Sequence, residues 1–173
     1  MNPWLISSLI LFLAWLIIFL FSKSIRKEML WASLMTFPLG LTEPLFVPEY
    51  WNPPSLFNLA AKTGFDIESF IFAFSIGGIA SVLYEIFFKA KHKKMSKKEM
   101  GSEKHRFHSL VLISPLAVFI LLEAISDFNV IYSVIISLLI GSLFYLLCRP
   151  DLKRKMFIGG LLFLFFYFAF FIF

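Results

Sequence analysis

The chain has little cysteine and almost no long hydrophilic sequence. Its only cysteine, Cys148, excludes a disulfide within the chain. No G-x-G-x-x-G sequence is present, so the usual flavin- or nicotinamide-binding turn is missing. The three histidines, His92, His105 and His108, are too loosely spaced to indicate a metal site. The sequence therefore predicts neither a cofactor nor a bound metal.

Polar residues are also too few to cover a soluble core, because 60% of the 173 residues are hydrophobic. A membrane-spanning helix needs about 20 mostly apolar residues, and a helix satisfies its own backbone hydrogen bonds in lipid. The sequence therefore predicts an all-α integral membrane protein. Its six transmembrane helices are expected at Pro3–Phe21, Glu28–Phe46, Ile67–Phe88, Phe107–Ile125, Val130–Cys148 and Met156–Phe173.

Positive charge is confined to one side of this predicted arrangement. All Lys and Arg residues except Lys62 lie in three stretches, 23–27, 89–106 and 149–155, which follow the first, third and fifth apolar runs. The positive-inside rule makes these loops cytoplasmic and puts both termini outside. We therefore expect a multi-pass protein of the cell membrane, in contact with the lipid bilayer. Topology accounts for the net charge of +5, so we expect no nucleic-acid partner.

A weak internal repeat divides the chain into three-helix units. Leu16–Leu34 aligns with Leu143–Leu161, each containing a helix end, a short basic loop and the next helix start. We expect a first unit over 1–88, a basic cytoplasmic loop over 89–106 and a second, incomplete unit over 107–173. The missing part predicts a homodimer or a second subunit.

The outer segment 43–66 combines acids, aromatics and prolines. Its four prolines prevent a continuous helix, and Tyr50 and Trp51 suit a membrane interface. Ser55 is a plausible cap for a short helix that Gly64 would end. An ordinary outer loop with an aromatic belt would explain these features, and so would a functional site.

The run Ile67–Phe88 allows two interpretations as well. Asp66 as the N-cap and Glu68 in the first turn would be stabilised by the helix dipole, which is a purely structural explanation. In the functional interpretation, Glu68 shares a helix face with Ser75 and Gly78. Small residues along this helix favour close helix packing, or leave room for a slender hydrophobic ligand.

Acids in or near membrane helices are candidates for chemistry, and here they are Glu43, Glu68 and Glu123. An apolar site disfavours the charged form of a carboxyl group, which then acts as a general acid. Aromatic faces stabilise positive charge on a substrate. Protonation of a carbon–carbon double bond requires both a buried acid and aromatic faces that tolerate the cation.

Three segments, RKEMLWASL, EPLFVPEYWNPPSLF and DIESFIFAFSIGGIASVLYE, together resemble the membrane-integral lycopene cyclase domain family of the heterodimeric and fused type. The family has repeated three-helix units, and its third helix opens with a Pro-Ile-Glu-Glu motif. Here Ile67 and Glu68 match that motif, whereas Asp66 replaces its proline and Ser69 its second glutamate. One of the two acids expected to assist cyclisation is therefore absent.

The resemblance implies a carotenoid end-group cyclase, an isomerase with no net redox change, acting on a hydrophobic polyene or isoprenoid. We expect Glu68 to be the proton donor or the carboxylate that faces the cation, and Glu43 and Glu49 to assist it or to take a proton back. The expected pocket residues are Tyr50, Trp51, Phe70, Ser75 and Gly78. One alternative is a non-catalytic membrane subunit or scaffold descended from such a cyclase. Another is a carrier for a small polar solute, favoured only by Pro115 and Glu123.

Overall fold

The computed structural model describes residues 2–47, 50, 52–90 and 107–172, and every regular element in these ranges is a helix. The predicted all-α class is therefore confirmed. The chain forms two compact units. Unit 1 comprises Met1–Ala90 with Leu161–Phe173, and unit 2 comprises Lys91–Gly160. Each unit is described separately below.

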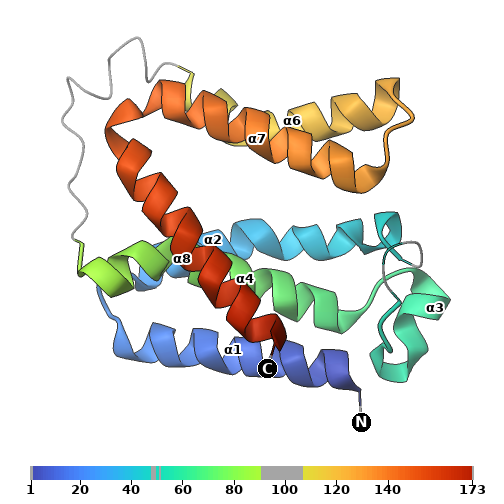
Figure 1. The fold of residues 1–173 in the computed structure, drawn as a ribbon. Helices are drawn as coiled ribbons and strands as arrows, with labels where there is room; N and C mark the ends of the chain where they lie inside the picture. The colour runs from blue at the N-terminus through green and yellow to red at the C-terminus, as the bar shows by residue number, and fades with distance from the viewer. Residues whose placement is uncertain (1, 48–49, 51, 91–106, 173) are drawn as a thin grey trace. The chain divides into compact units, whose positions relative to one another are not determined.

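Unit 1 is built on three long elements that lie side by side (Figure 1). They are α1 (Pro3–Phe21), α2 (Arg26–Thr36) with the 3₁₀ helix η1 (Phe37–Leu45), and α4 (Ile67–Phe88). The short helices η2 (Leu56–Asn58) and α3 (Leu59–Thr63) lie at the end where α4 begins. The last part of α8 (Lys153–Ile172) completes the unit. Its core includes Leu11, Trp15, Met29, Ile79 and Val82.

The predicted run Glu28–Phe46 is not one α-helix. The α-helix ends at Thr36 and continues as a 3₁₀ helix to Leu45. Pro38 and Pro44 explain the change, because proline lacks the backbone N–H that an α-helix uses and its ring clashes with the preceding turn. The change of winding determines which way Glu43 faces in this segment, and Glu43 is buried.

The start of α4 agrees with the sequence analysis. Asp66 is the N-cap, and its side chain accepts a hydrogen bond from the Ser69 N–H at 2.5 Å. The short helix before it ends at Gly64 as predicted, with a left-handed φ of 80°, but it is divided into η2 and α3 because Phe57 and Asn58 have positive φ. The N-cap of α3 is Asn58, and the Ser55 hydroxyl accepts a hydrogen bond from the Ala60 N–H at 2.9 Å.

Small and hydroxyl-bearing residues bring α1, α2 and α4 close together. The Trp15 indole N–H donates to the Ser33 hydroxyl at 2.8 Å, and the Thr36 hydroxyl donates to the Ala73 carbonyl at 2.8 Å. A Cβ atom at Gly78 would overlap both Ser33 and Trp15. Hydrogen bonds and close backbone approach are the main sources of helix association in lipid, so this seam holds unit 1 together.

We expect Gly78→Ala to destabilise the protein by about 1–3 kcal/mol, because an added methyl group overpacks this contact. Gly160→Ala is the matched control. Open space surrounds Gly160 on its own helix, so alanine there is expected to be neutral or to stabilise by up to about 1 kcal/mol. Unfolding of the purified protein by denaturing detergent measures both effects. Equal stabilities for the two variants would contradict the close packing at Gly78.

Unit 2 is a helical hairpin. Helix α6 (His108–Ile125) packs against α7 (Val130–Cys148), followed by η4 (Pro150–Leu152) and the first part of α8. Ser133, Ser137 and Gly141 form a buried stripe along α7. Pro115 of α6 fits against Gly141, where a Cβ atom would overlap the proline ring. Pro115, one of the two residues that favour a solute carrier, therefore packs within the hairpin.

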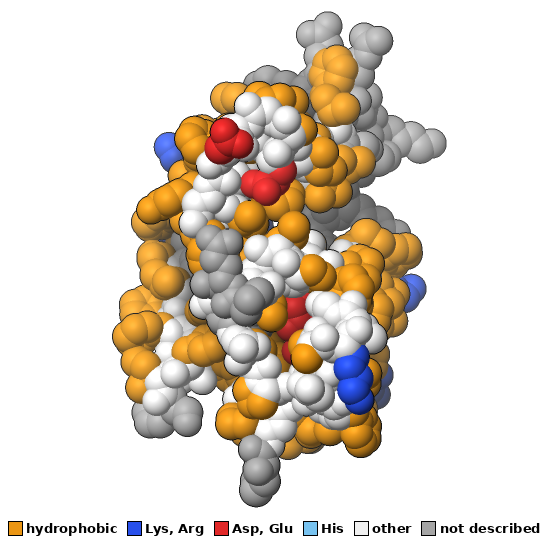
Figure 2. All heavy atoms as spheres, turned by 90° about the vertical axis from the view of Figure 1, so that its right-hand side faces the viewer, with side chains coloured by type: hydrophobic (Ala, Val, Ile, Leu, Met, Phe, Trp, Pro, Cys, Tyr) orange, Lys and Arg blue, Asp and Glu red, His pale blue; other side chains and the backbone are white. Residues whose placement is uncertain are grey.

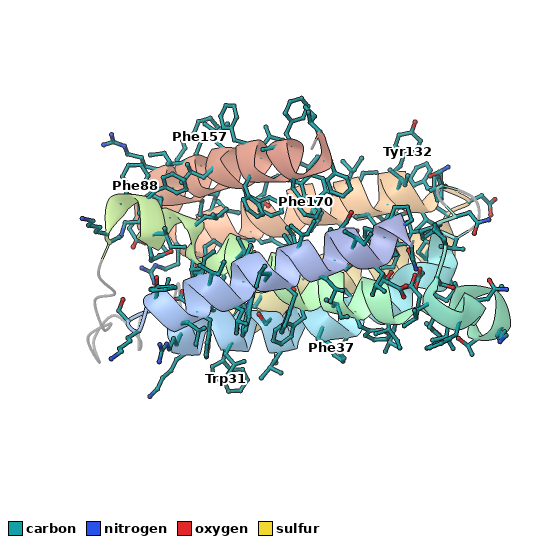
Figure 3. All side chains as sticks on the ribbon, turned by 90° about the horizontal axis from the view of Figure 1, so that it is seen from below. Trp31, Phe37, Phe88, Tyr132, Phe157 and Phe170 are labelled. Atoms are coloured by element: carbon teal, nitrogen blue, oxygen red, sulfur yellow. The ribbon has the colours of Figure 1, made fainter. Side chains whose placement is uncertain are left out.

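Within the described ranges, four helical segments are long and apolar enough to cross a membrane: Pro3–Phe21, Ile67–Phe88, Val130–Cys148 and Pro150–Ile172. Leu110–Ile125 is a shorter apolar helix. Large apolar side chains point outward in both units, among them Trp31 and Phe37 in Figure 3, which are 65% and 45% exposed. Outward apolar side chains are typical of helices surrounded by lipid. The predictions of six spans and of their orientation in the membrane stay predictions.

Candidate functional site: an acid in an aromatic pocket

Unit 1 contains an open pocket of about 540 Å³ beside the start of α4. Residues from α1, α2, η1, the following loop, α4 and α8 line it, and most are apolar or aromatic. They are Trp4, Thr36, Leu39, Gly40, Thr42, Glu43, Phe46, Tyr50, Ser69, Phe72, Ala73, Ile76, Tyr167 and Phe171. Among the described residues, Glu43 supplies the only carboxyl group on this wall. The pocket thus combines one acid with a wall rich in aromatic rings.

Several of these rings are in mutual contact. The centroids of Trp4 and Phe72 are 5.1 Å apart, and those of Phe72 and Phe171 are 6.3 Å apart. The rings of Phe46 and Tyr50 meet at 6.2 Å in an edge-on arrangement. Such contacts hold the rings in place, and an aromatic face attracts a cation placed over it. This wall can therefore stabilise positive charge in an apolar ligand.

Glu43 is deeply buried, with 5% of its surface exposed. Its Oε2 accepts a hydrogen bond from the Asp66 N–H at 2.9 Å. Its Oε1 has no hydrogen-bond donor among the described residues. Burial raises the pKa of Glu43, which lies outside the four membrane-length helices, from 4.5 to about 7. The Asp66 carboxyl contributes to this rise in pKa, while the Asp66 N–H and Ser69 oppose it.

The raised pKa of Glu43 predicts that the protein is less stable at pH 8 than at pH 5. Between pH 4.5 and about 7 the folded protein keeps a proton on Glu43 that the unfolded chain releases. The contribution of protonated Glu43 to the free energy of unfolding is therefore fully present below pH 4.5 and is lost as the pH rises to about 7. We expect Tm in detergent to fall across this window, and Glu43→Gln to remove most of that fall. A variant with the same pH dependence as the wild type would contradict this assignment.

Glu68, the predicted proton donor, does not line the pocket. Its side chain is fully buried, and its Oε1 accepts two hydrogen bonds of 2.7 Å, from the Asn2 amide and from the Leu56 N–H. Its other oxygen has no donor among the described residues. Glu68 therefore ties the start of α1 and the start of η2 to the first turn of α4. This geometry fits the structural interpretation of its position.

The remaining predicted site residues are distributed as follows. Tyr50 lines the pocket, next to Phe46. The ring of Phe70 contacts that of Phe37 in a tilted arrangement, at 5.0 Å between centroids, and does not lie on the pocket wall. Ser75 is buried and donates to the Ile71 carbonyl of its own helix at 2.7 Å. The space beside Gly78 is filled by the side chains of Ser33 from α2 and Trp15 from α1.

Two predicted residues, Glu49 and Trp51, lie outside the described part of the chain. Glu123 belongs to unit 2, near the end of α6, and its Oε1 has no donor among the residues that the structure describes. Within the same residues, no group of three or more His, Cys, Asp or Glu side chains has the arrangement of a metal site.

Sequence reasoning missed several members of the pocket: Trp4, Thr36, Ser69, Phe72, Tyr167 and Phe171. Their common property is that they come from segments far apart in the sequence.

Figure 2 shows the end of the molecule that carries α3, where acidic atoms in the lower half are recessed among uncharged surface atoms. The clearest missed relationship is between Asp66 and Glu43, because Asp66 was interpreted only as a helix cap.

Searches against protein-family models, curated proteins and solved structures find no match for this chain.

Proposed function

We propose that this protein is a membrane-embedded cyclase of a long polyene or related isoprenoid, similar to lycopene cyclases. The observation that carries the proposal is the Glu43 carboxyl, buried on the wall of a pocket rich in aromatic side chains. The resemblance of the segments around Glu43 and Glu68 to the lycopene cyclase domain supports the substrate class. The apolar lining and the membrane-length helices suit a substrate that resides in lipid.

Glu43 is the proton donor in this proposal. Its proton adds to a terminal double bond of the polyene, and the resulting carbocation is attacked by a neighbouring double bond, which closes the ring. Loss of a proton from a carbon next to the new cation restores a double bond, and the glutamate carboxylate takes that proton back. Bonds and protons balance, and the substrate is neither oxidised nor reduced.

The aromatic wall would stabilise the cation between these two proton transfers. The rings of Trp4, Phe72 and Tyr50 line the same pocket as Glu43. An aromatic face stabilises a nearby cation by about 0.5–2 kcal/mol, with the larger values in dry sites. Aromatic rings are also poor bases and nucleophiles, so they would not trap the carbocation as water does.

The proposed topology has six spans: α2 and the first part of η1 form the second, which ends before Glu43, and α6 forms the fourth. The Lys-rich loops face the cytoplasm and both termini lie outside, as the positive-inside rule predicts. Glu43 and Tyr50 then lie near the outer face of the membrane. A polyene lying along the bilayer would reach this site with one end.

Coexpression tests the activity. The full chain is produced in cells that accumulate lycopene, and the pigments are separated by chromatography. We expect products with one or two terminal rings that cells with an empty vector lack. Unchanged lycopene, with the protein shown to be folded in the membrane fraction, would exclude this substrate and weaken the cyclase proposal.

The second candidate is a non-catalytic membrane subunit or scaffold. The specific observation in its favour is the double hydrogen bond at Glu68, which is a sufficient structural reason for the acid that matches the cyclase motif. This candidate predicts that the Glu43 carboxyl can be replaced without any loss of function. It accounts less well for an acid buried on the wall of an open pocket.

A further inference from the structure

Two carboxyl groups are buried side by side at the start of α4. Glu43 is 5% exposed and Asp66 is 2% exposed, and the Asp66 N–H donates to Glu43 Oε2 at 2.9 Å. One oxygen of Asp66, Oδ1, accepts the helix-capping hydrogen bond from Ser69. The remaining oxygens, Glu43 Oε1 and Asp66 Oδ2, are both buried and find no donor among the described residues.

Two buried acceptors without a donor are unfavourable, because each has lost its hydrogen bonds to water. One proton placed between the two carboxyl groups would turn one acid into a donor and satisfy both oxygens. No Lys or Arg of the part of the chain that the structure describes lines the pocket to neutralise a pair of charges instead. Two negative charges on neighbouring carboxyl groups in an apolar site repel one another strongly.

We propose that Glu43 and Asp66 share a single proton, and that Asp66 is the second acid of the site. Asp66 acts through Glu43 as a positioning residue, since Glu43 lines the pocket and Asp66 does not. In the resemblance, Ser69 stands where a second glutamate is expected and Asp66 stands where a proline is expected. The structure thus provides a second carboxyl at the N-cap of α4, in place of the one missing from its first turn.

The shared proton does not depend on the proposed function, but its role in ring closure does. When Glu43 gives its proton to a double bond, the pair is left with two negative charges in an apolar site. That state favours return of a proton from the carbocation, which ends the reaction with a ring and a restored acid. The other titratable groups around the pocket are Tyr50 and Tyr167 on its wall, and Glu68 on α4, whose Oε1 already accepts two hydrogen bonds.

Infrared spectroscopy of the full chain in lipid vesicles tests the shared proton without any substrate. A protonated carboxyl group has a C=O stretch that shifts in D₂O and vanishes on ionisation. We expect the wild type to lose one such band with a midpoint near pH 7. Glu43→Gln should abolish this transition, and Asp66→Asn should lower its midpoint by at least one pH unit.

Asn caps a helix about as well as Asp, so Asp66→Asn keeps the cap while it removes the second carboxyl. Glu68→Gln is the matched control, a buried acid on the same helix, and should leave the midpoint unchanged. Circular dichroism establishes that each variant is folded, and Asp66→Ser replaces Asp66→Asn if that variant does not fold. An unchanged midpoint in Asp66→Asn or Asp66→Ser would overturn the shared proton. A normal transition in a protein that makes no cyclic product would overturn the proposed function and leave the carboxyl pair intact.

Discussion

Replacing Glu43 by glutamine is expected to lower the rate of ring formation by about 100- to 10,000-fold, the usual contribution of a positioned general acid. Glutamine has nearly the same shape and can still accept the hydrogen bond from the Asp66 N–H, but it carries no transferable proton. The measurement is the amount of cyclic product formed per amount of folded protein in lycopene-producing cells.

Glu68→Gln is the matched control for this experiment. The glutamine amide oxygen can still accept hydrogen bonds from Asn2 and Leu56, so we expect the variant to keep most of its activity. The opposite result, an active Glu43→Gln and an inactive but folded Glu68→Gln, would identify Glu68 as the proton donor. It would also show that the pocket on the Glu43 side is not where the substrate reacts.

Removing the Glu68 side chain is expected to have the largest effect on stability. In Glu68→Ala, the Asn2 amide and the Leu56 N–H both lose their acceptor, and each buried unpaired donor costs about 1–3 kcal/mol. The cavity left behind adds to that cost. We therefore expect Glu68→Ala to lose several kcal/mol, whereas Glu68→Gln loses much less. Unfolding followed by the fluorescence of the buried Trp4 and Trp15 measures the difference.

If Glu68→Ala were as stable as the wild type, Glu68 would not join α1, η2 and α4 as its hydrogen bonds indicate. A second informative result would be equal destabilisation by alanine and glutamine. That result would mean that the negative charge itself, and not the acceptor oxygen, holds this end of unit 1 together.

Local sequence signals predicted helix positions well. The helices at Pro3–Phe21, Ile67–Phe88 and Val130–Cys148 have the predicted bounds, because each is one uninterrupted apolar run between clear end signals. Asp66 is the N-cap and Gly64 ends α3, as their residue types indicate. The run Glu28–Phe46 was predicted as one helix despite its prolines, and the structure shows the change of winding that those prolines cause.

The candidate site was less predictable, because its geometry depends on contacts between helices. Helical periodicity correctly grouped Glu68, Ser75 and Gly78 on one buried face of α4. It could not show that α2 packs against part of that face, at Gly78, so that no space for a ligand remains there. Nor could it show that η1 brings Glu43 to Asp66, since that contact joins two segments far apart in the sequence.

The most direct test is to let the protein make its product in D₂O. A ring closed by a proton from Glu43, which exchanges with solvent, must carry one deuterium for each ring, and mass spectrometry counts it. We expect that mass increase in the product of the wild type and of Glu68→Gln, and far less cyclic product from Glu43→Gln. Cyclic product without deuterium, or formed equally well by Glu43→Gln, would contradict an acid-initiated reaction at Glu43.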